Sequence, residues 1–356
     1  MKEAIKVSAP AKVHFLGEHF VVYGGPALIT TVDRRCKVDL LPRDSSEIKI
    51  SSRNLDREVV LSVDQVLAKR EDSQKKWEAY RDGGDIAVLR AISSDDMDHS
   101  IIAIGETLHF FNKRLPSGFS LSIDSEIPVG AALGSSASTA VTIVAAMTSF
   151  LGQDFNKNTI NDIAFLVEQR KHGLPSGGDN AAVCFGGLIW FRKETPDIKV
   201  IQQVPFSVAP SVAKNFVIID TGRPKESTGE MVGMVRTLRD NNRQMVDKVL
   251  YDQERLTREL TVALKSGSEK DIMAIIKAGE RNLEAIGVAS PSSMRLIREI
   301  EDAGGVAKIC GAGGKTEATG VVLAYNSDPS IPQKIASSHN LRVYPTVLGV
   351  DGLRQE

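Results

Sequence analysis

Cysteine is scarce in this sequence, and the few cysteines present argue against two kinds of protein. Cys36, Cys184 and Cys310 are far apart in the chain and odd in number. They fit neither a cluster of metal ligands nor a framework of disulfides. We therefore expect three small, buried, apolar side chains in a protein from a reducing compartment.

A surplus of either charge and a long apolar run are also lacking. The 44 Lys and Arg residues nearly balance the 45 Asp and Glu residues, which gives a formal net charge of −1. No long basic block is present, so we expect no nucleic-acid partner. No run approaches the ~20 apolar residues that cross a bilayer, and residues 1–7 lack the apolar core of a signal peptide. The expectation is a soluble cytoplasmic protein with no membrane partner.

The length and the order of segments predict two domains. A chain of 356 residues can build two domains of ordinary size, each with its own core. The pattern is interrupted by polar and proline-containing stretches near residues 194–210, and we find no internal repeat. Strands and helices are mixed in both blocks, which is typical of an α+β protein. We place the domains at residues 1–195 and 196–356.

Local patterns predict the following elements. Strands are expected at 5–7 and 13–16 around a turn at 9–11, at 38–41 and 47–50 as a hairpin, and at 119–123, 215–219, 307–310, 318–325 and 341–347. Helices are expected at 100–113, 137–150, 158–170, 228–265, 269–286, 292–303 and 331–339. Residues 74–84 indicate an exposed polar excursion, and residues 181–190 a strand and turn.

The segment from Pro128 to Ser138 carries the strongest chemical signal. It contains two glycines and two adjacent serines, and a run without Gly or Pro follows to Phe150. Glycine allows close approach of the backbone to a ligand, and a helix N-terminus attracts phosphate. The spacing does not match the loop of Walker-type NTPases. Ser135 or Ser136 could bind magnesium through a hydroxyl, or could simply cap the helix.

Three further segments contain candidate catalytic groups. Lys12 follows a proline near the head of a strand, and Glu18 and His19 come just after a glycine. Glu168 lies near the end of a predicted helix, and Asp179 follows a Gly-rich turn 11 positions later (179 − 168). Two carboxylates placed in this way can divide metal binding and proton removal between them, and a lysine beside them can supply a point charge. Taken singly, each of these side chains could instead be an ordinary surface or core residue. Residues 308–314 run from a strand into glycines, as a tight turn or a ligand contact.

The order of these motifs resembles the GHMP kinase superfamily of galacto-, homoserine, mevalonate and phosphomevalonate kinases. The resemblance rests on Pro-Ala-Lys12, Gly17-Glu-His, the Gly130–Ser136 loop, Pro175-Ser-Gly-Gly-Asp-Asn180 and Gly311-Ala-Gly-Gly314, and it covers nearly the whole chain. Residues 17–24, Gly-Glu-His-Phe-Val-Val-Tyr-Gly, are most similar to mevalonate kinases.

The resemblance implies a fold, a reaction and roles for residues. It implies the two-domain GHMP kinase fold, with an N-terminal domain like ribosomal protein S5 domain 2 and a ferredoxin-like C-terminal domain. It implies ATP and Mg²⁺ as cofactors, mevalonate as the acceptor and a homodimer. The residues that it implies are Asp179 as catalytic base with Lys12 beside it; Glu18, His19 and Thr228 for mevalonate; Ser136 and Glu168 for magnesium; and Pro128, Gly130, Ala131, Ala132, Leu133, Gly134, Ser135, Ser136 and Ala137 for the ATP phosphates.

One departure from the family pattern leaves alternatives open. The family continues the last motif with more glycines, whereas this chain has Lys315 and Glu317. The two could pair with each other, Lys315 could reach a phosphate, or both could alter the acceptor pocket. An added cation near the acceptor, such as Lys225 or Lys315, would favour a phosphorylated acceptor such as phosphomevalonate. A catalytically silent metabolite sensor is a third possibility.

Overall fold

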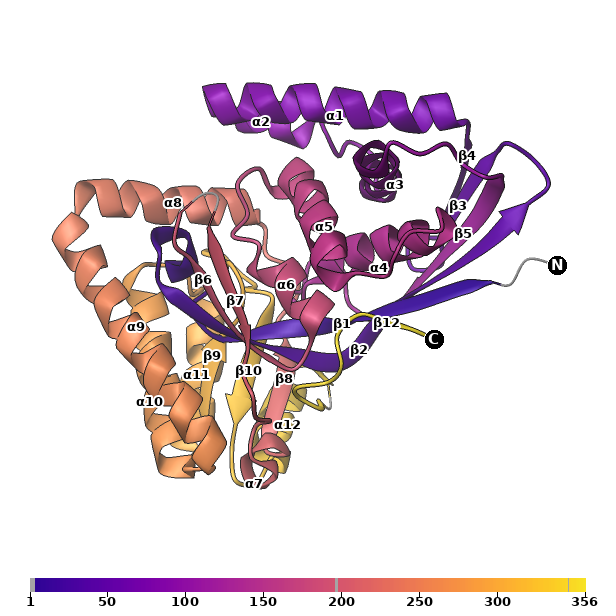
Figure 1. Cartoon of the computed structure of the whole chain (residues 1–356). Coiled ribbons are helices and arrows are strands. Elements are labelled where there is room, and N and C mark those ends of the chain that lie inside the picture. Colours follow the sequence, from indigo (N-terminus) through magenta and orange to yellow (C-terminus); the bar gives the residue numbers. More distant parts are fainter. Residues whose placement is uncertain (1–3, 196–197, 345) are drawn as a thin grey trace.

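The computed structural model describes residues 4–195, 198–344 and 346–356, and Figure 1 shows two sheets with their helices. The strands are β1 (Ile5–Leu16), β2 (Pro26–Arg43), β3 (Ile48–Ser52), β4 (Arg57–Leu61), β5 (Gly118–Ser125), β6 (Leu188–Lys193), β7 (Lys199–Gln203), β8 (Phe216–Asp220), β9 (Val306–Ile309), β10 (Val321–Tyr325), β11 (Arg342–Tyr344) and β12 (Arg354–Gln355). The helices are α1 (Val63–Gly83), α2 (Ile86–Arg90), α3 (Asp98–Phe111), α4 (Ser135–Phe150), α5 (Lys157–His172), α6 (Gly178–Phe185), α7 (Pro210–Ala213), α8 (Thr228–Asn241), α9 (Arg243–Ser266), α10 (Glu269–Ala285), α11 (Pro291–Asp302) and α12 (Ser330–Ser338), with a 3₁₀ turn η1 (Phe20–Tyr23). The predicted α+β class is confirmed.

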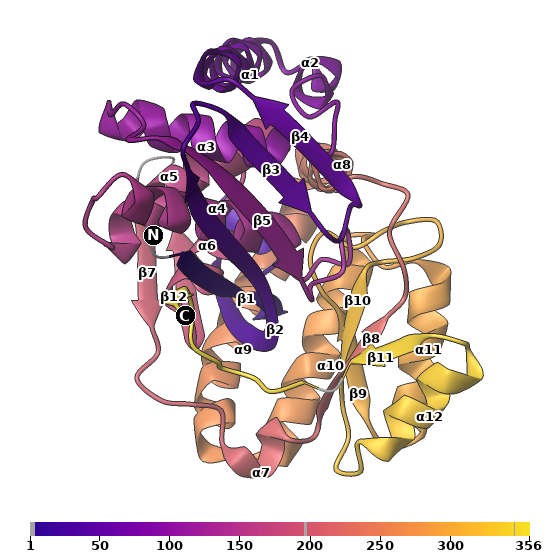
Figure 2. The ribbon, with the colours of Figure 1, turned by 90° about the vertical axis from the view of Figure 1, so that its right-hand side faces the viewer.

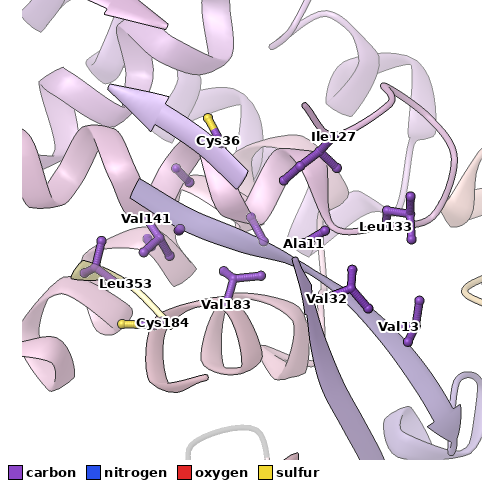
Figure 3. Close-up of a cluster of buried hydrophobic side chains, with 14 of the residues drawn as sticks. Ala11, Val13, Val32, Cys36, Ile127, Leu133, Val141, Val183, Cys184 and Leu353 are labelled. Atoms are coloured by element: carbon purple, nitrogen blue, oxygen red, sulfur yellow. The ribbon is translucent and has the colours of Figure 1, made fainter. Parts of the chain in front are cut away.

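The larger sheet has the strand order β12-β1-β2-β5-β3-β4, and β6 and β7 extend it from β2. Its pairs are antiparallel except for β3 with β5. Helices α4 and α6 cover β1 and β2, and Figure 3 shows Val141 of α4 and Val183 of α6 among side chains from these strands. Packing in this apolar layer fixes the distance of both helices from β1, the strand that carries Lys12.

Two strand predictions were wrong. Residues 5–16 form one strand rather than two around a turn, because the sheet accommodates Pro10 at a register shift between Pro10 and Ala11. Proline has no N–H to donate, so a break in the ladder is a position that tolerates it. The predicted hairpin is also absent: residues 36–43 pair with β5, and β3 pairs with β4 and with β5.

Two further segments are helices that local patterns did not predict. Residues 63–83 form α1, which starts with a capping box between Ser62 and Gln65. Trp77 anchors this helix to the core, because the residue is only 9% exposed and its indole N–H donates a hydrogen bond of 2.8 Å to the Gly173 carbonyl. Residues 178–185 form α6 after the left-handed Gly177, whereas we expected a strand and turn over residues 181–190; a strand, β6, begins only at Leu188.

The smaller sheet has the order β11-β8-β10-β9 and is antiparallel throughout. Helices α10, α11 and α12 pack on it, and Figure 2 shows this unit beside the larger sheet. The predicted long helix over 228–265 is two helices, α8 and α9, separated at Asn242, whose φ of −143° and ψ of 60° are not helical. The strand predicted at 341–347 is a strand only over 342–344; residues 346 and 347 are not in a strand, and residue 345 lies outside the described ranges.

The course of the chain between the two sheets refines the limits of the domains. Strand β7, at residues 199–203, still pairs with β6 of the larger sheet, and β12 returns to β1. Arg35 holds the segment before β12 in place. Its guanidinium donates hydrogen bonds to the carbonyls of Asp351 at 2.8 Å and Gly352 at 2.7 Å. We therefore propose two domains whose changeover follows β7, with the last residues of the chain belonging to the first.

Two expectations from composition can be compared with the structure. Cys36, Cys184 and Cys310 are free and fully buried, as predicted. Among the described residues, no helix combines the length and the apolar character that a membrane crossing needs.

Candidate active site

Strand β1 carries Lys12 to the face where the two domains meet. The side chain of Lys12 is only 2% exposed, and its backbone N–H donates to the Leu133 carbonyl at 3.0 Å. Gly134 makes room for it, because a Cβ at that position would lie 2.8 Å from Lys12 Cγ. Gly134 also has a φ of +76°, which favours glycine. The loop before α4 and the lysine therefore depend on each other for their positions.

Asp179 lies opposite Lys12, in the first turn of α6. Its Oδ2 is 3.0 Å from Lys12 Nζ, and its side chain keeps 41% of its surface exposed. A helix N-terminus favours a negative charge at this place. Burial alone would raise the pKa of Asp179, but Lys12 and His14 outweigh it and lower the pKa below its usual value. An ionised carboxylate thus faces open space while its counter-ion is buried.

The loop between β5 and α4 has the form of an anion site. Gly130, Ala132 and Gly134 take positive φ values of 80°, 63° and 76°. The N-cap of α4 is Gly134, and no side chain caps this helix in the described structure. The serines therefore are not caps, which answers one alternative left open by the sequence. The N–H groups of the first turn of α4 remain available to an anion.

The other predicted residues of this loop are of two kinds, buried and partly exposed. Ala131, Leu133 and Ala137 are buried and hold the loop on the core, whereas Pro128 and Ser135 are partly exposed. Arg223, which sequence reasoning missed, comes from the second domain and contacts this loop. Its Cδ and Cγ lie 3.0 Å from the position that a Cβ on Gly130 would take.

Ser136 and Glu168 are brought together beside this loop. Ser136 Oγ donates to Glu168 Oε1 at 2.5 Å, and Glu168 is 4% exposed. A hydroxyl and a carboxylate are oxygen ligands of the kind that Mg²⁺ prefers. No group of three or more His, Cys, Asp or Glu residues suited to a metal occurs among the described residues. As two oxygen ligands, Ser136 and Glu168 fit magnesium.

Two histidines that sequence reasoning did not single out flank Glu168. His99 Nε2 lies 3.7 Å from Glu168 Oε1 and 3.1 Å from the Ser136 carbonyl oxygen, while His172 Nε2 lies 3.6 Å from Glu168 Oε2. Burial lowers the pKa of both rings. Both rings are therefore neutral neighbours of Glu168 near neutral pH. The spacing of His172, four residues after Glu168 on α5, was the signal available in the sequence.

Glu18 and His19 join the first motif to the last. Glu18 forms an ion pair with Lys308 of β9, and both side chains are at most 1% exposed. His19 Nε2 lies 2.9 Å from the Ala312 carbonyl oxygen within the 311–314 loop. Glu18 Oε2 and His19 Nδ1 are buried and have no hydrogen-bond partner in the described part of the chain. These two atoms are polar groups suited to a bound ligand.

Lys308 was the residue in the last motif whose importance the sequence did not reveal. Besides Glu18, its ammonium reaches the His14 carbonyl oxygen at 3.4 Å. Beneath it, Glu280 Oε2 accepts from the Ile309 N–H at 2.9 Å. Burial raises the pKa of Glu280 to about 8. The segment after β9 is therefore an interface between domains as well as a tight turn.

The remaining predicted residues lie at the rim. Thr228 is exposed and begins α8, directly after the N-cap Ser227. Glu317 pairs with Lys225 at 2.7 Å rather than with Lys315, and both partners are mostly exposed. This pair neutralises one of the two lysines that would have favoured a phosphorylated acceptor.

The chain is similar to known proteins over most of its length. Residues 102–187 match the family model described as the GHMP kinases N terminal domain. Mevalonate kinase from Pyrococcus abyssi is 30% identical over 325 residues, covering 88% of this chain and 87% of that protein. Mevalonate kinase from Archaeoglobus fulgidus is 31% identical over 307 residues, covering 86% and 88%. The crystal structure of the Methanococcus jannaschii mevalonate kinase has a TM-score of 0.76 at 19% identity, covering 100% of this chain and 99% of that chain. The motifs, the two-domain fold and these relatives together place the chain in the mevalonate kinase family of the GHMP kinase superfamily.

Proposed function

We propose that this protein phosphorylates the 5-hydroxyl of mevalonate with ATP, giving 5-phosphomevalonate and ADP, in the cytoplasmic mevalonate pathway to isoprenoids. The observation that carries the proposal is the 3.0 Å contact between Lys12 Nζ and Asp179 Oδ2. This contact joins a buried cation and a partly exposed, ionised carboxylate near the loop to which we assign the phosphates. Phosphoryl transfer needs positioning and charge stabilisation more than covalent chemistry, and this arrangement supplies both.

The acceptor side of the reaction falls to Asp179 and its neighbours. The mevalonate hydroxyl oxygen attacks the γ-phosphorus of ATP, its proton passes to Asp179, and ADP leaves. Lys12 stabilises the negative charge that develops on the oxygen. We assign Glu18 and His19 to mevalonate because each has an unsatisfied buried atom that a hydroxyl or carboxylate of the acceptor would satisfy. Thr228 completes this side from the start of α8.

The donor side falls to the loop at 128–137. Its backbone N–H groups and the first turn of α4 would hold the phosphates. Arg223 adds a positive charge from the second domain. Ser136 and Glu168 would hold magnesium, which neutralises charge on the phosphate oxygens.

A coupled ADP-release assay with ATP, Mg²⁺ and four acceptors tests the proposal. We expect turnover with mevalonate and little with phosphomevalonate, galactose or homoserine, and NMR of the product should show the phosphate on the 5-oxygen. Turnover only with phosphomevalonate would support the runner-up, which the exposed Lys225–Glu317 pair does not favour. ATP binding without turnover of any acceptor would indicate a sensor. Sedimentation would test the homodimer that we expect from the resemblance.

Asp179→Asn tests the assigned base directly. The amide has nearly the same shape but cannot accept the proton, so activity should fall ~10²-fold or more, the usual loss for general-base help. ATP binding should change little, because the phosphate loop and the Ser136–Glu168 pair remain. A fully active Asp179→Asn enzyme would refute the assignment.

A further inference from the structure

His14 is a histidine in the site that neither the motifs nor the proposed mechanism uses. It lies on β1 two residues after Lys12, and side chains two apart on a strand share a face. The ladder with β2 shifts register between His14 and Leu16, which marks a bulge directly after the histidine. The residue is only 6% exposed. A polar ring is thus held in the floor of the site.

The ring of His14 lies against both members of the central ion pair. Its Nδ1 is 3.4 Å from Lys12 Nζ, and its Nε2 is 3.6 Å from Asp179 Oδ1. An ammonium group only donates, so Nδ1 has to be the acceptor of that contact. The proton of the neutral ring therefore sits on Nε2, which lies 3.6 Å from Asp179 Oδ1, just beyond hydrogen-bond distance.

The charge state of the ring is consistent with this tautomer. Burial lowers the pKa of His14 to about 4, and Lys12 acts in the same direction. The other charged groups that face the ring are Asp179 and Glu18, which raise the pKa, and Lys308, which lowers it. The imidazole is therefore neutral at the pH at which a cytoplasmic kinase works.

The backbone of His14 is fixed from the second domain. Its carbonyl oxygen accepts hydrogen bonds from Lys308 Nζ at 3.4 Å and from Cys310 Sγ at 3.5 Å. Both donors belong to β9 or the residue after it, so docking of the C-terminal domain sets where the ring lies. The position of His14 is the joint product of β1 and the smaller sheet.

We propose that His14 is a positioning residue for phosphoryl transfer, which holds the Asp179 carboxylate through Oδ1 while Lys12 holds it through Oδ2. The inference rests on the proposed kinase reaction. Catalytic contacts often shorten when substrate binds. A contraction of the 3.6 Å contact would give each carboxylate oxygen one donor, which fixes the plane of the carboxylate and favours its ionised form. The same ring orients the Lys12 ammonium by accepting from it. His14 itself neither takes nor gives the substrate proton, which passes to Asp179.

Substitutions that separate ring shape from hydrogen bonding test the proposal. His14→Phe keeps the ring but removes both polar contacts, so kcat should fall about tenfold, the size of one lost charge-assisted hydrogen bond. The acidic limb of kcat/KM should move to higher pH, because Asp179 loses a donor, while KM for ATP stays the same. His14→Gln places an amide N–H near the position of Nε2. It should restore much of kcat and return the acidic limb of kcat/KM towards its wild-type pH. His109→Gln, at an exposed position near the end of α3, is the matched control and should behave as wild type.

A second measurement does not depend on activity. The ¹⁵N shifts of the imidazole nitrogens in the wild-type protein, with the His14 signals assigned by their loss in His14→Gln, should show protonated Nε2 and bare Nδ1. Protonated Nδ1 would overturn the proposal, as would a His14→Phe enzyme with wild-type kcat and an unmoved acidic limb. An equal loss of kcat in His14→Phe and His14→Gln with no change of the pH profile would mean a purely structural role and would also overturn it. If the wild type fails to phosphorylate mevalonate, the proposed function falls, while the tautomer still decides whether His14 orients this pair.

Discussion

The buried ion pair between Glu18 and Lys308 offers a sharp test of how the two domains are held together. Both side chains are at most 1% exposed, so neither charge can be hydrated if its partner is removed. Replacing Lys308 by Met keeps the length and apolar stem of the side chain but leaves the Glu18 carboxylate buried without a cation. Loss of one partner of such a pair costs about 3–5 kcal/mol of folding free energy. Lys308→Met should therefore be strongly destabilised.

The double variant Glu18→Gln with Lys308→Met distinguishes an unpaired charge from a poorly packed side chain. It removes both charges together, so it should recover much of the stability that the single variant loses. Lys225→Met is the matched control, because its partner Glu317 is 69% exposed and the free energy of unfolding should not change. Urea denaturation followed by circular dichroism measures all four proteins. The reasoning would be wrong if Lys308→Met stayed within about 0.5 kcal/mol of wild type, the range of ordinary surface substitutions, or if the double variant were the least stable.

Three further predictions concern other parts of the site. Gly134→Ala should lower kcat about tenfold or more by pushing a Cβ against Lys12 Cγ, 2.8 Å away, and a kinetic assay should find Gly233→Ala, where a Cβ would meet nothing within 4 Å, unaffected. Ser136→Ala should raise the Mg²⁺ concentration needed for half-maximal rate without changing the acidic limb of the pH profile, and an equal Mg²⁺ requirement would contradict the assigned ligand. Burial raises the pKa of the Glu280 carboxyl group from 4.5 to about 8. The folded state therefore holds this proton more tightly than the unfolded state, and the stability that this supplies is complete below pH 4.5 and is lost as the pH rises to 8. Glu280→Gln imitates the protonated acid. Between pH 4.5 and 8, its free energy of unfolding, measured by urea denaturation, should therefore fall less than that of the wild type.

The core of the site could be predicted from the sequence because its chemistry sits in short motifs. Lys12 meets Asp179, and Ser136 meets Glu168, as the resemblance implied. Lys308 could not be predicted in the same way. Its importance comes from burial against a residue 290 positions earlier in the chain, and no local pattern reports such a contact.

The fold errors have a similar physical origin. Parallel pairing of β3 with β5 depends on which strands share a core, whereas local sequence indicates only that each is extended. The polar α1 buries only Val66, Ser73 and Trp77, so it lacks the apolar stripe by which helices are usually recognised. Its capping box at Ser62 was a usable signal. The apolar stripe continues almost unbroken across α8 and α9, so little in the sequence indicated the break between the two helices.

The return of β12 to β1 has a consequence for how the protein is made. Ser8 and Glu356, which contact each other across this edge of the sheet, are separated by 348 positions. At ~5–20 residues per second, a ribosome needs roughly 17–70 s to synthesise the second partner after the first. During that interval the outer edge of β1 has no strand to cover it, and exposed edges recruit other chains. Expression that slows translation or crowds nascent chains should therefore increase aggregation through the exposed edge of β1.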